Sequence, residues 1–132
     1  MIAQTALVAF VWIRMYLTRI RELRQRQLNP QSLSTSAQAS GVLTDVAAAD
    51  NFRNLFEVPV LFYAVCCALS IVGAESVTQV ALAWLFVGLR IVHTFIHVTY
   101  NRVMHRFAAY VLSTVVVFLM WAQLAMSLYT DG

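Results

Sequence analysis

Seven polar side chains that could bind or activate a ligand recur at helical spacing in three parts of the chain. They are Arg53, Asn54 and Glu57, then Arg90 and His93, then Arg106 and Tyr110. Residues three or four positions apart share one face of a helix, so each set forms a polar stripe. An arginine binds a carboxylate through two parallel hydrogen bonds, and a nearby cation favours the thiolate form of a thiol. The stripes therefore predict a site for an anionic ligand that carries a thiol.

The charges of this predicted site fit glutathione. That tripeptide has carboxylates for the arginines, an α-amine for Glu57, and a thiol whose reactive form is the thiolate. We therefore expect glutathione to bind here as a co-substrate.

The elements that must position these side chains are membrane helices. Of the 132 residues, 61% are hydrophobic and 11% are charged, and the mean hydropathy is +0.72, whereas soluble domains have about 25% charged residues. Because lipid cannot satisfy an open backbone, only helices can cross it as separate segments. We predict one transmembrane domain over 1–132, an all-α integral membrane four-helix bundle of up-down topology. Its helices are expected at about 2–26, 44–72, 77–101 and 105–129.

The distribution of positive charge predicts the orientation of the bundle. All nine basic residues are arginines, and most lie near the end of the first helix and at 101–106. Because positive charge is retained in the cytoplasm, we expect both termini on the non-cytoplasmic side and the site facing the cytoplasm of a bacterial inner membrane. The arginines follow the first apolar segment, so we predict a retained helix and no secretion signal. The net charge of +3 comes from these membrane edges, so no nucleic-acid partner is predicted.

Arg90 differs from the arginines at the membrane edge. It lies about 11 residues, or roughly 16 Å, from the cytoplasmic end of its helix, which is too deep for easy contact with headgroups. A buried cation needs a partner, and Glu57 is the carboxylate in the same half of the membrane. We predict an Arg90–Glu57 ion pair that holds two helices in register.

His93 and His97 have the spacing of two metal ligands on one helix. A metalloprotease helix requires a glutamate after the first histidine, and Thr94 stands there instead. No third ligand is evident and the nearby arginines would repel a cation, so no metal site is predicted.

In order and depth, these motifs resemble those of the MAPEG family, the membrane-associated proteins in eicosanoid and glutathione metabolism. The matching motifs are Arg53-Asn54-x-x-Glu57, Arg90-x-x-His93 and Arg106-x-x-x-Tyr110, with Arg14-Met15-Tyr16 on the first helix. Their spacing is most similar to that of the microsomal prostaglandin E synthase branch. The resemblance implies a homotrimer with glutathione between neighbouring subunits and Arg106 nearest the thiol. The implied catalytic residues are Arg106 and Tyr110, and the implied ligand contacts are Arg26, Arg53, Asn54, Glu57, His93, Arg106 and Tyr110.

Three residues depart from the pattern of that branch. His97 stands in place of a tyrosine, Phe107 in place of a serine near the thiol, and Asp50 in place of an arginine. Two functions follow from the motifs and these departures. One is a glutathione-dependent membrane transferase or peroxidase acting on lipophilic electrophiles that arrive through the lipid. The alternative is a non-catalytic protein of the same fold, serving as a structural or accessory partner in a membrane protein assembly.

Overall fold

The computed structural model describes residues 1–29, 31, 35, 39, 41–43 and 47–130. Within this part of the chain the regular structure is helical and contains no strand. The main helices are α1 (Ile2–Gln25), α3 (Ala47–Asn54), α4 (Val58–Val72), α5 (Val77–Val98) and α6 (Val103–Thr130). The start predicted for the second helix, at residues 44–46, lies outside the described residues.

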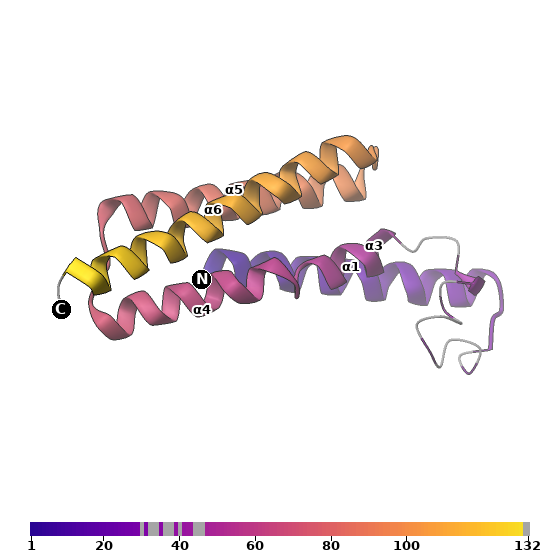
Figure 1. The fold of residues 1–132 in the computed structure, drawn as a ribbon. Coiled ribbons are helices and arrows are strands. Elements are labelled where there is room, and N and C mark those ends of the chain that lie inside the picture. Colours follow the sequence, from indigo (N-terminus) through magenta and orange to yellow (C-terminus); the bar gives the residue numbers. More distant parts are fainter. Residues whose placement is uncertain (30, 32–34, 36–38, 40, 44–46, 131–132) are drawn as a thin grey trace.

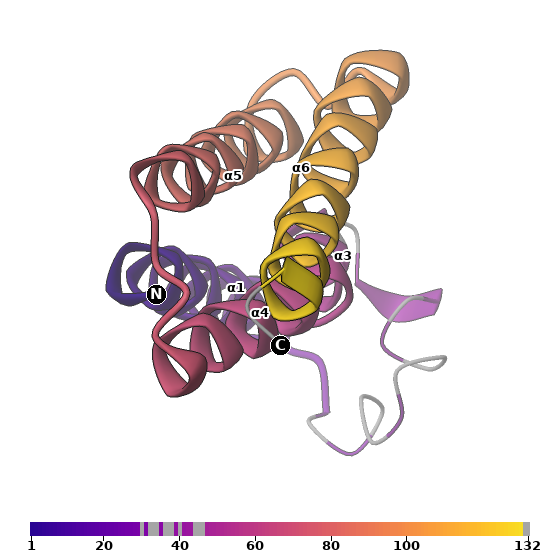
Figure 2. The ribbon, with the colours of Figure 1, turned by 60° about the vertical axis from the view of Figure 1, so that its left-hand side comes forward.

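The helices form an up-down bundle in which α5 and α6 run side by side above α1, α3 and α4 (Figure 1). The view turned by 60° shows α1, α4, α5 and α6 at the four corners of the bundle (Figure 2). Among the described residues, three runs are long and apolar enough to cross a membrane: Ala49–Val72, Val77–Val98 and Val103–Thr130. Helix α1 is as long, but Arg14 and Arg19 interrupt its apolar residues. The prediction of an all-α integral membrane bundle is confirmed.

The core lies where α4, α5 and α6 meet. Phe62 of α4 and Phe86 of α5 are both completely buried and stack with ring centroids 4.4 Å apart. Val65 and Val117 pack in the same cluster. This core fixes the mutual position of α5 and α6, which carry two of the polar stripes, and of α4, which follows the third stripe in the chain.

The helix predicted to run without interruption from 44 to 72 is broken, so that prediction is wrong in detail. Helix α3 ends at Asn54 and α4 begins at Val58, with Glu57 outside helical geometry (φ −91°, ψ −97°). Pro59 has no N–H to donate to the preceding turn, and proline is well suited to the first turn of a new helix. The break leaves the Asn54 carbonyl available to a partner from another helix.

A tight connection joins α5 to α6. Helix α5 ends at Val98, three residues earlier than predicted at 101, and α6 begins at Val103. Asn101 has a positive φ of 45°, a conformation that asparagine tolerates better than most residues. Its N–H donates to the carbonyl of Ile96 at 2.8 Å. The turn folds the start of α6 back against the end of α5.

Candidate functional site

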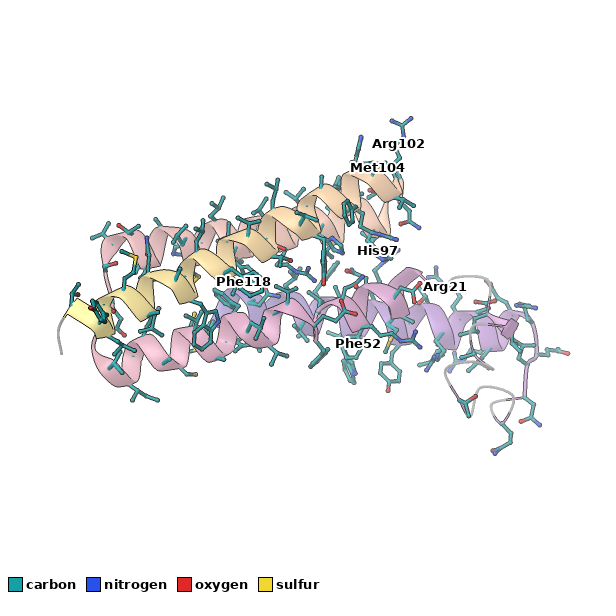
Figure 3. The ribbon with its side chains drawn as sticks, in the orientation of Figure 1. Arg21, Phe52, His97, Arg102, Met104 and Phe118 are labelled. Carbon is teal, nitrogen blue, oxygen red and sulfur yellow. The ribbon has the colours of Figure 1, made fainter. Side chains whose placement is uncertain are left out.

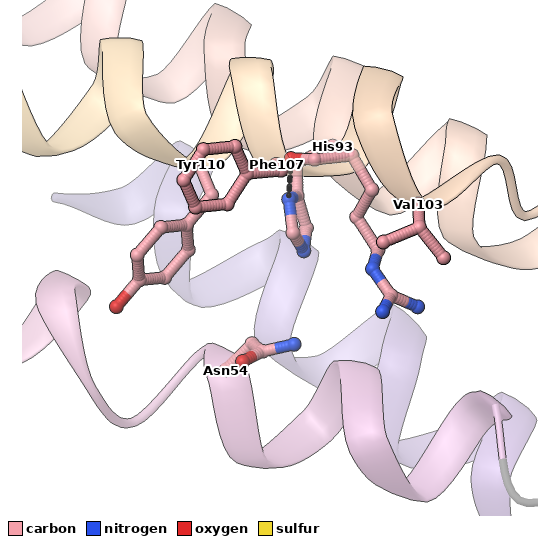
Figure 4. Close-up of a pocket in the computed structure, with 6 residues that line it drawn as sticks. Asn54, His93, Val103, Phe107 and Tyr110 are labelled. Atoms are coloured by element: carbon pink, nitrogen blue, oxygen red, sulfur yellow. Dashed lines mark hydrogen bonds between the residues drawn. The ribbon is translucent and has the colours of Figure 1, made fainter.

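A cavity of about 210 Å³ lies where α3, α5 and α6 converge. Figure 4 shows Asn54 of α3 facing His93 of α5 and Tyr110 of α6 across it. The full lining is Asn54, His93, Val103, Arg106, Phe107 and Tyr110. Four of the residues predicted from the polar stripes, Asn54, His93, Arg106 and Tyr110, are therefore brought to one cavity.

Arg90 lies beside this cavity and is completely buried. Its Nη2 donates to the Asn54 carbonyl at 2.8 Å, and its guanidinium carbon is 5.9 Å from the centroid of the Tyr110 ring, within the range of a cation–π contact. No described residue accepts from Nε or Nη1. Arg90 thus supports two residues of the cavity wall, Asn54 and Tyr110.

The direct ion pair predicted between Arg90 and Glu57 is not formed among the described residues. The physical reason is the helix break, because it gives Arg90 a backbone carbonyl as its partner. Glu57 remains exposed, and its carboxylate accepts a hydrogen bond from the Tyr110 hydroxyl at 3.3 Å. Glu57 therefore lies at the rim of the cavity and orients Tyr110.

The hydrogen bond of His93 fixes which ring nitrogen carries a proton. Nδ1 is 3.1 Å from the Arg106 carbonyl, the contact marked by the dashed line in Figure 4. Because a carbonyl only accepts, Nδ1 is the donor. The other nitrogen, Nε2, is buried and has no partner among the described residues. His93 therefore lines the cavity with a ring whose second nitrogen is an unused hydrogen-bond acceptor.

Two residues outside the predicted set hold the head group of Arg106. Its Nη1 is 2.8 Å from Asn101 Oδ1 and 3.1 Å from His97 Nε2. Figure 3 shows His97 directed from α5 toward α3, whereas Arg102 points away from the bundle. The sequence marked His97 as one of two possible metal ligands and as a departure from a family pattern, and it gave no role to Asn101. The i, i+4 spacing of His93 and His97 was the available signal.

Arg53 does not line the cavity in this structure. Its Nη1 is 3.8 Å from Asp50 Oδ1, and both side chains are more than half exposed. An exposed pair of this kind contributes little to stability. Its significance is electrostatic, because Asp50 partly offsets the positive charge that Arg53 would present to a ligand.

Arg26 lies farthest from the cavity. Arg14 Nη2 donates to the carbonyl of Val98 at 3.4 Å, so this level of α1 coincides with the end of α5, and Arg26 follows about 18 Å farther along the helix axis. There it donates to Glu22 at 2.7 Å and to the Val42 carbonyl at 2.6 Å. Arg26 therefore does not reach the cavity.

Metal-ligating side chains do not gather anywhere in the described part of the chain, where no three of His, Cys, Asp and Glu come together. His93 Nδ1 and His97 Nε2 are both engaged in hydrogen bonds with Arg106.

The sequence model of the MAPEG family matches residues 1–126 of the chain. No curated protein and no solved structure matches this chain.

Proposed function

The chain belongs to the MAPEG family, and from this premise we propose that its cavity binds glutathione as the co-substrate of a membrane transferase or peroxidase. The second substrate would be a lipophilic electrophile that reaches the site through the lipid. The observation that carries the proposal is the convergence of Arg106, His93 and Tyr110 on one cavity wall. A cation, a nitrogen acceptor and a phenol there surround the position of a thiol.

The chemistry of the proposed reaction begins with the thiol of glutathione. The Arg106 guanidinium would stabilise the thiolate, which is the nucleophilic form. Asn101 and His97 hold Nη1 of this guanidinium, so its remaining N–H groups are available to sulfur. The thiolate would then form a carbon–sulfur bond to the electrophile, and any displaced group would leave with the electron pair. With a peroxide, the thiolate would attack one oxygen and break the oxygen–oxygen bond, which releases an alcohol, and a second glutathione would convert the resulting sulfenic acid to the disulfide and water.

The size of the cavity supports a ligand site that is shared between two subunits. Small-molecule pockets usually measure about 300–1,000 Å³, so a cavity of about 210 Å³ has room for the thiol end and not for the whole tripeptide. The carboxylates and the amine would lie outside it, near Glu57 and Arg53. Because Arg26 does not reach the cavity of its own protomer, we propose that it binds the ligand of a neighbouring subunit in a homotrimer.

We propose that the protein is integral to a bacterial inner membrane and that its site opens to the cytoplasm. The cavity lies at the α5–α6 end of the bundle, and the arginine-rich end of α1 extends past that end (Figure 1). Arginine-rich membrane edges are retained in the cytoplasm, which supports this orientation.

One observation favours a second function. Phe107 lines the cavity at the position where the prostaglandin E synthase branch has a serine, so the cavity lacks a hydroxyl at that point. The motif spacing still favours that branch, but the phenyl ring argues against prostaglandin isomerisation as the activity. The alternative is a non-catalytic protein of the same fold that serves as a structural or accessory subunit of a membrane protein assembly.

Glutathione titrated into the detergent-purified protein separates these functions. Isothermal calorimetry reports binding, and the ultraviolet absorbance of a thiolate reports activation. S-methylglutathione, which has no ionisable thiol, is the control and should bind without the absorbance change. Binding with a thiolate signal supports the enzyme, binding without it supports the accessory subunit, and absence of binding overturns the proposal.

A further inference from the structure

We propose that His97 is a positioning residue that acts through Arg106. In its neutral form, with the proton on Nδ1, it holds the Arg106 guanidinium in place at the cavity. The consequence for thiol activation rests on the proposed function, whereas the contact itself does not.

The tautomer follows from the chemistry of the two partners. A guanidinium carries five N–H donors and no acceptor, so Arg106 Nη1 must be the donor in its 3.1 Å contact with His97 Nε2. An Nε2 that accepts carries no proton, and the single proton of the neutral ring is then on Nδ1. A second proton on the ring would turn Nε2 into a donor and break the contact.

The second acceptor completes the fixation of Nη1. This nitrogen has two hydrogens, and Asn101 Oδ1 at 2.8 Å provides a partner for the hydrogen that His97 does not bind. Asn101 is itself held, because its N–H donates to the Ile96 carbonyl. Since both hydrogens of Nη1 are engaged, the donors left to a ligand are those of Nε and Nη2, for which no described residue is a partner.

His97 is a suitable anchor because the protein encloses it. Only 2% of its surface is exposed, so the ring cannot turn into solvent. One helical turn earlier on α5, His93 donates to the backbone carbonyl of the same arginine at 3.1 Å. The two histidines therefore hold Arg106 at both ends, one at the main chain and the other at the charged head.

The first test is nitrogen-15 NMR of the full protein labelled at histidine. The chain has three histidines, and His93→Asn and His97→Gln spectra assign the signals. We expect His97 to be neutral and protonated at Nδ1 at neutral pH. A proton on Nε2, or a doubly protonated ring, overturns the inference even if glutathione binds.

The second test uses a matched pair of substitutions. Glutamine at position 97 can place Oε1 near the Nε2 position and keep the acceptor, whereas phenylalanine keeps a planar ring without one. We expect His97→Gln to keep the ratio of bound thiolate to thiol unchanged. We expect His97→Phe to lower this ratio about tenfold, the effect of losing a hydrogen bond to a charged group. His105→Phe, on an exposed side chain, is the control and should change nothing. Equal loss in the Gln and Phe variants would show that the ring matters only for packing and would overturn the inference.

A third measurement keeps the inference separate from the proposed function. Hydrogen exchange of the Arg106 guanidinium, assigned by its absence in Arg106→Lys, needs no glutathione. Slow exchange in the unmodified protein and in His97→Gln, with fast exchange in His97→Phe, supports positioning by His97. Equal exchange in all three overturns it. Failure of glutathione to bind would overturn the proposed function alone.

Discussion

Replacing Arg106 by alanine should abolish thiolate formation while leaving the bundle intact. The cavity of about 210 Å³ has the volume of a sphere of about 3.7 Å radius, so a sulfur inside it lies roughly 5 Å from the guanidinium. At that distance, with an effective dielectric constant of about 20, one positive charge stabilises a thiolate by roughly 3 kcal/mol. This energy corresponds to about a 150-fold change in the ratio of thiolate to thiol.

The assay is the ultraviolet absorbance of bound thiolate at pH 7. An ordinary thiol with a pKa of about 8.5 is about 3% ionised at this pH. With the 150-fold gain, the unmodified protein should hold about 80% of bound glutathione as thiolate, and Arg106→Ala should return it to a few per cent. The matched control is Arg102→Ala, which removes an exposed arginine that points away from the bundle (Figure 3). The reasoning is refuted if Arg106→Ala keeps the thiolate signal, or if Arg102→Ala loses it to the same extent.

Three further changes probe the site, the subunit boundary and the core. Phe107→Ser should raise the ratio of bound thiolate to thiol about tenfold, to about 98% thiolate, by adding one hydrogen bond to a charged sulfur. Phe107→Ala supplies the space without the hydroxyl, and an equal gain in both variants would contradict this mechanism. Arg26→Ala should weaken glutathione binding about tenfold in calorimetry without reducing the thiolate fraction of the ligand that remains bound, whereas unchanged affinity would argue against a contribution from the neighbouring subunit. Phe62→Ala should destabilise the protein by about 3–5 kcal/mol because the ring is completely buried and stacked. The exposed Val60→Ala should leave the unfolding transition in detergent nearly unchanged, and equal effects would mean that the core lies elsewhere.

The positions of the helices along the chain could be predicted from the sequence because they depend on composition. Lipid permits only helices as separate crossing segments, so the apolar runs ending at Val72 and beginning at Val77 were sufficient to predict α4 and α5. The stripe spacing likewise predicted that Asn54, His93 and Tyr110 would share a depth, and the three do line one cavity.

The contacts inside the site were not accessible in the same way. A proline such as Pro59 can kink a helix, but its presence in the sequence does not show that the chain leaves helical geometry at Glu57 and frees the Asn54 carbonyl. A sequence gives the formal charge of Arg90 and does not give the position of an unpaired backbone oxygen. The hydrogen bond from Arg106 to Asn101 depends on a turn in which Asn101 has a positive φ. Helical periodicity does not predict this local backbone conformation.

The hydrogen-bond partner of Arg90 determines which contacts remain open to the Glu57 carboxylate. A carboxylate paired with a buried guanidinium would be neutralised and held inside the bundle. Because the Asn54 carbonyl takes the Nη2 hydrogen bond instead, Glu57 lies at the rim, where its hydrogen-bond partner among the described residues is the Tyr110 hydroxyl. An unneutralised carboxylate beside a cavity lined by arginine can attract the amine of a ligand whose thiol lies deeper, near Arg106. The break in the helix therefore separates two roles that the sequence had assigned to one residue: a backbone oxygen braces Arg90, and the Glu57 carboxylate stays accessible to the amine of the proposed ligand.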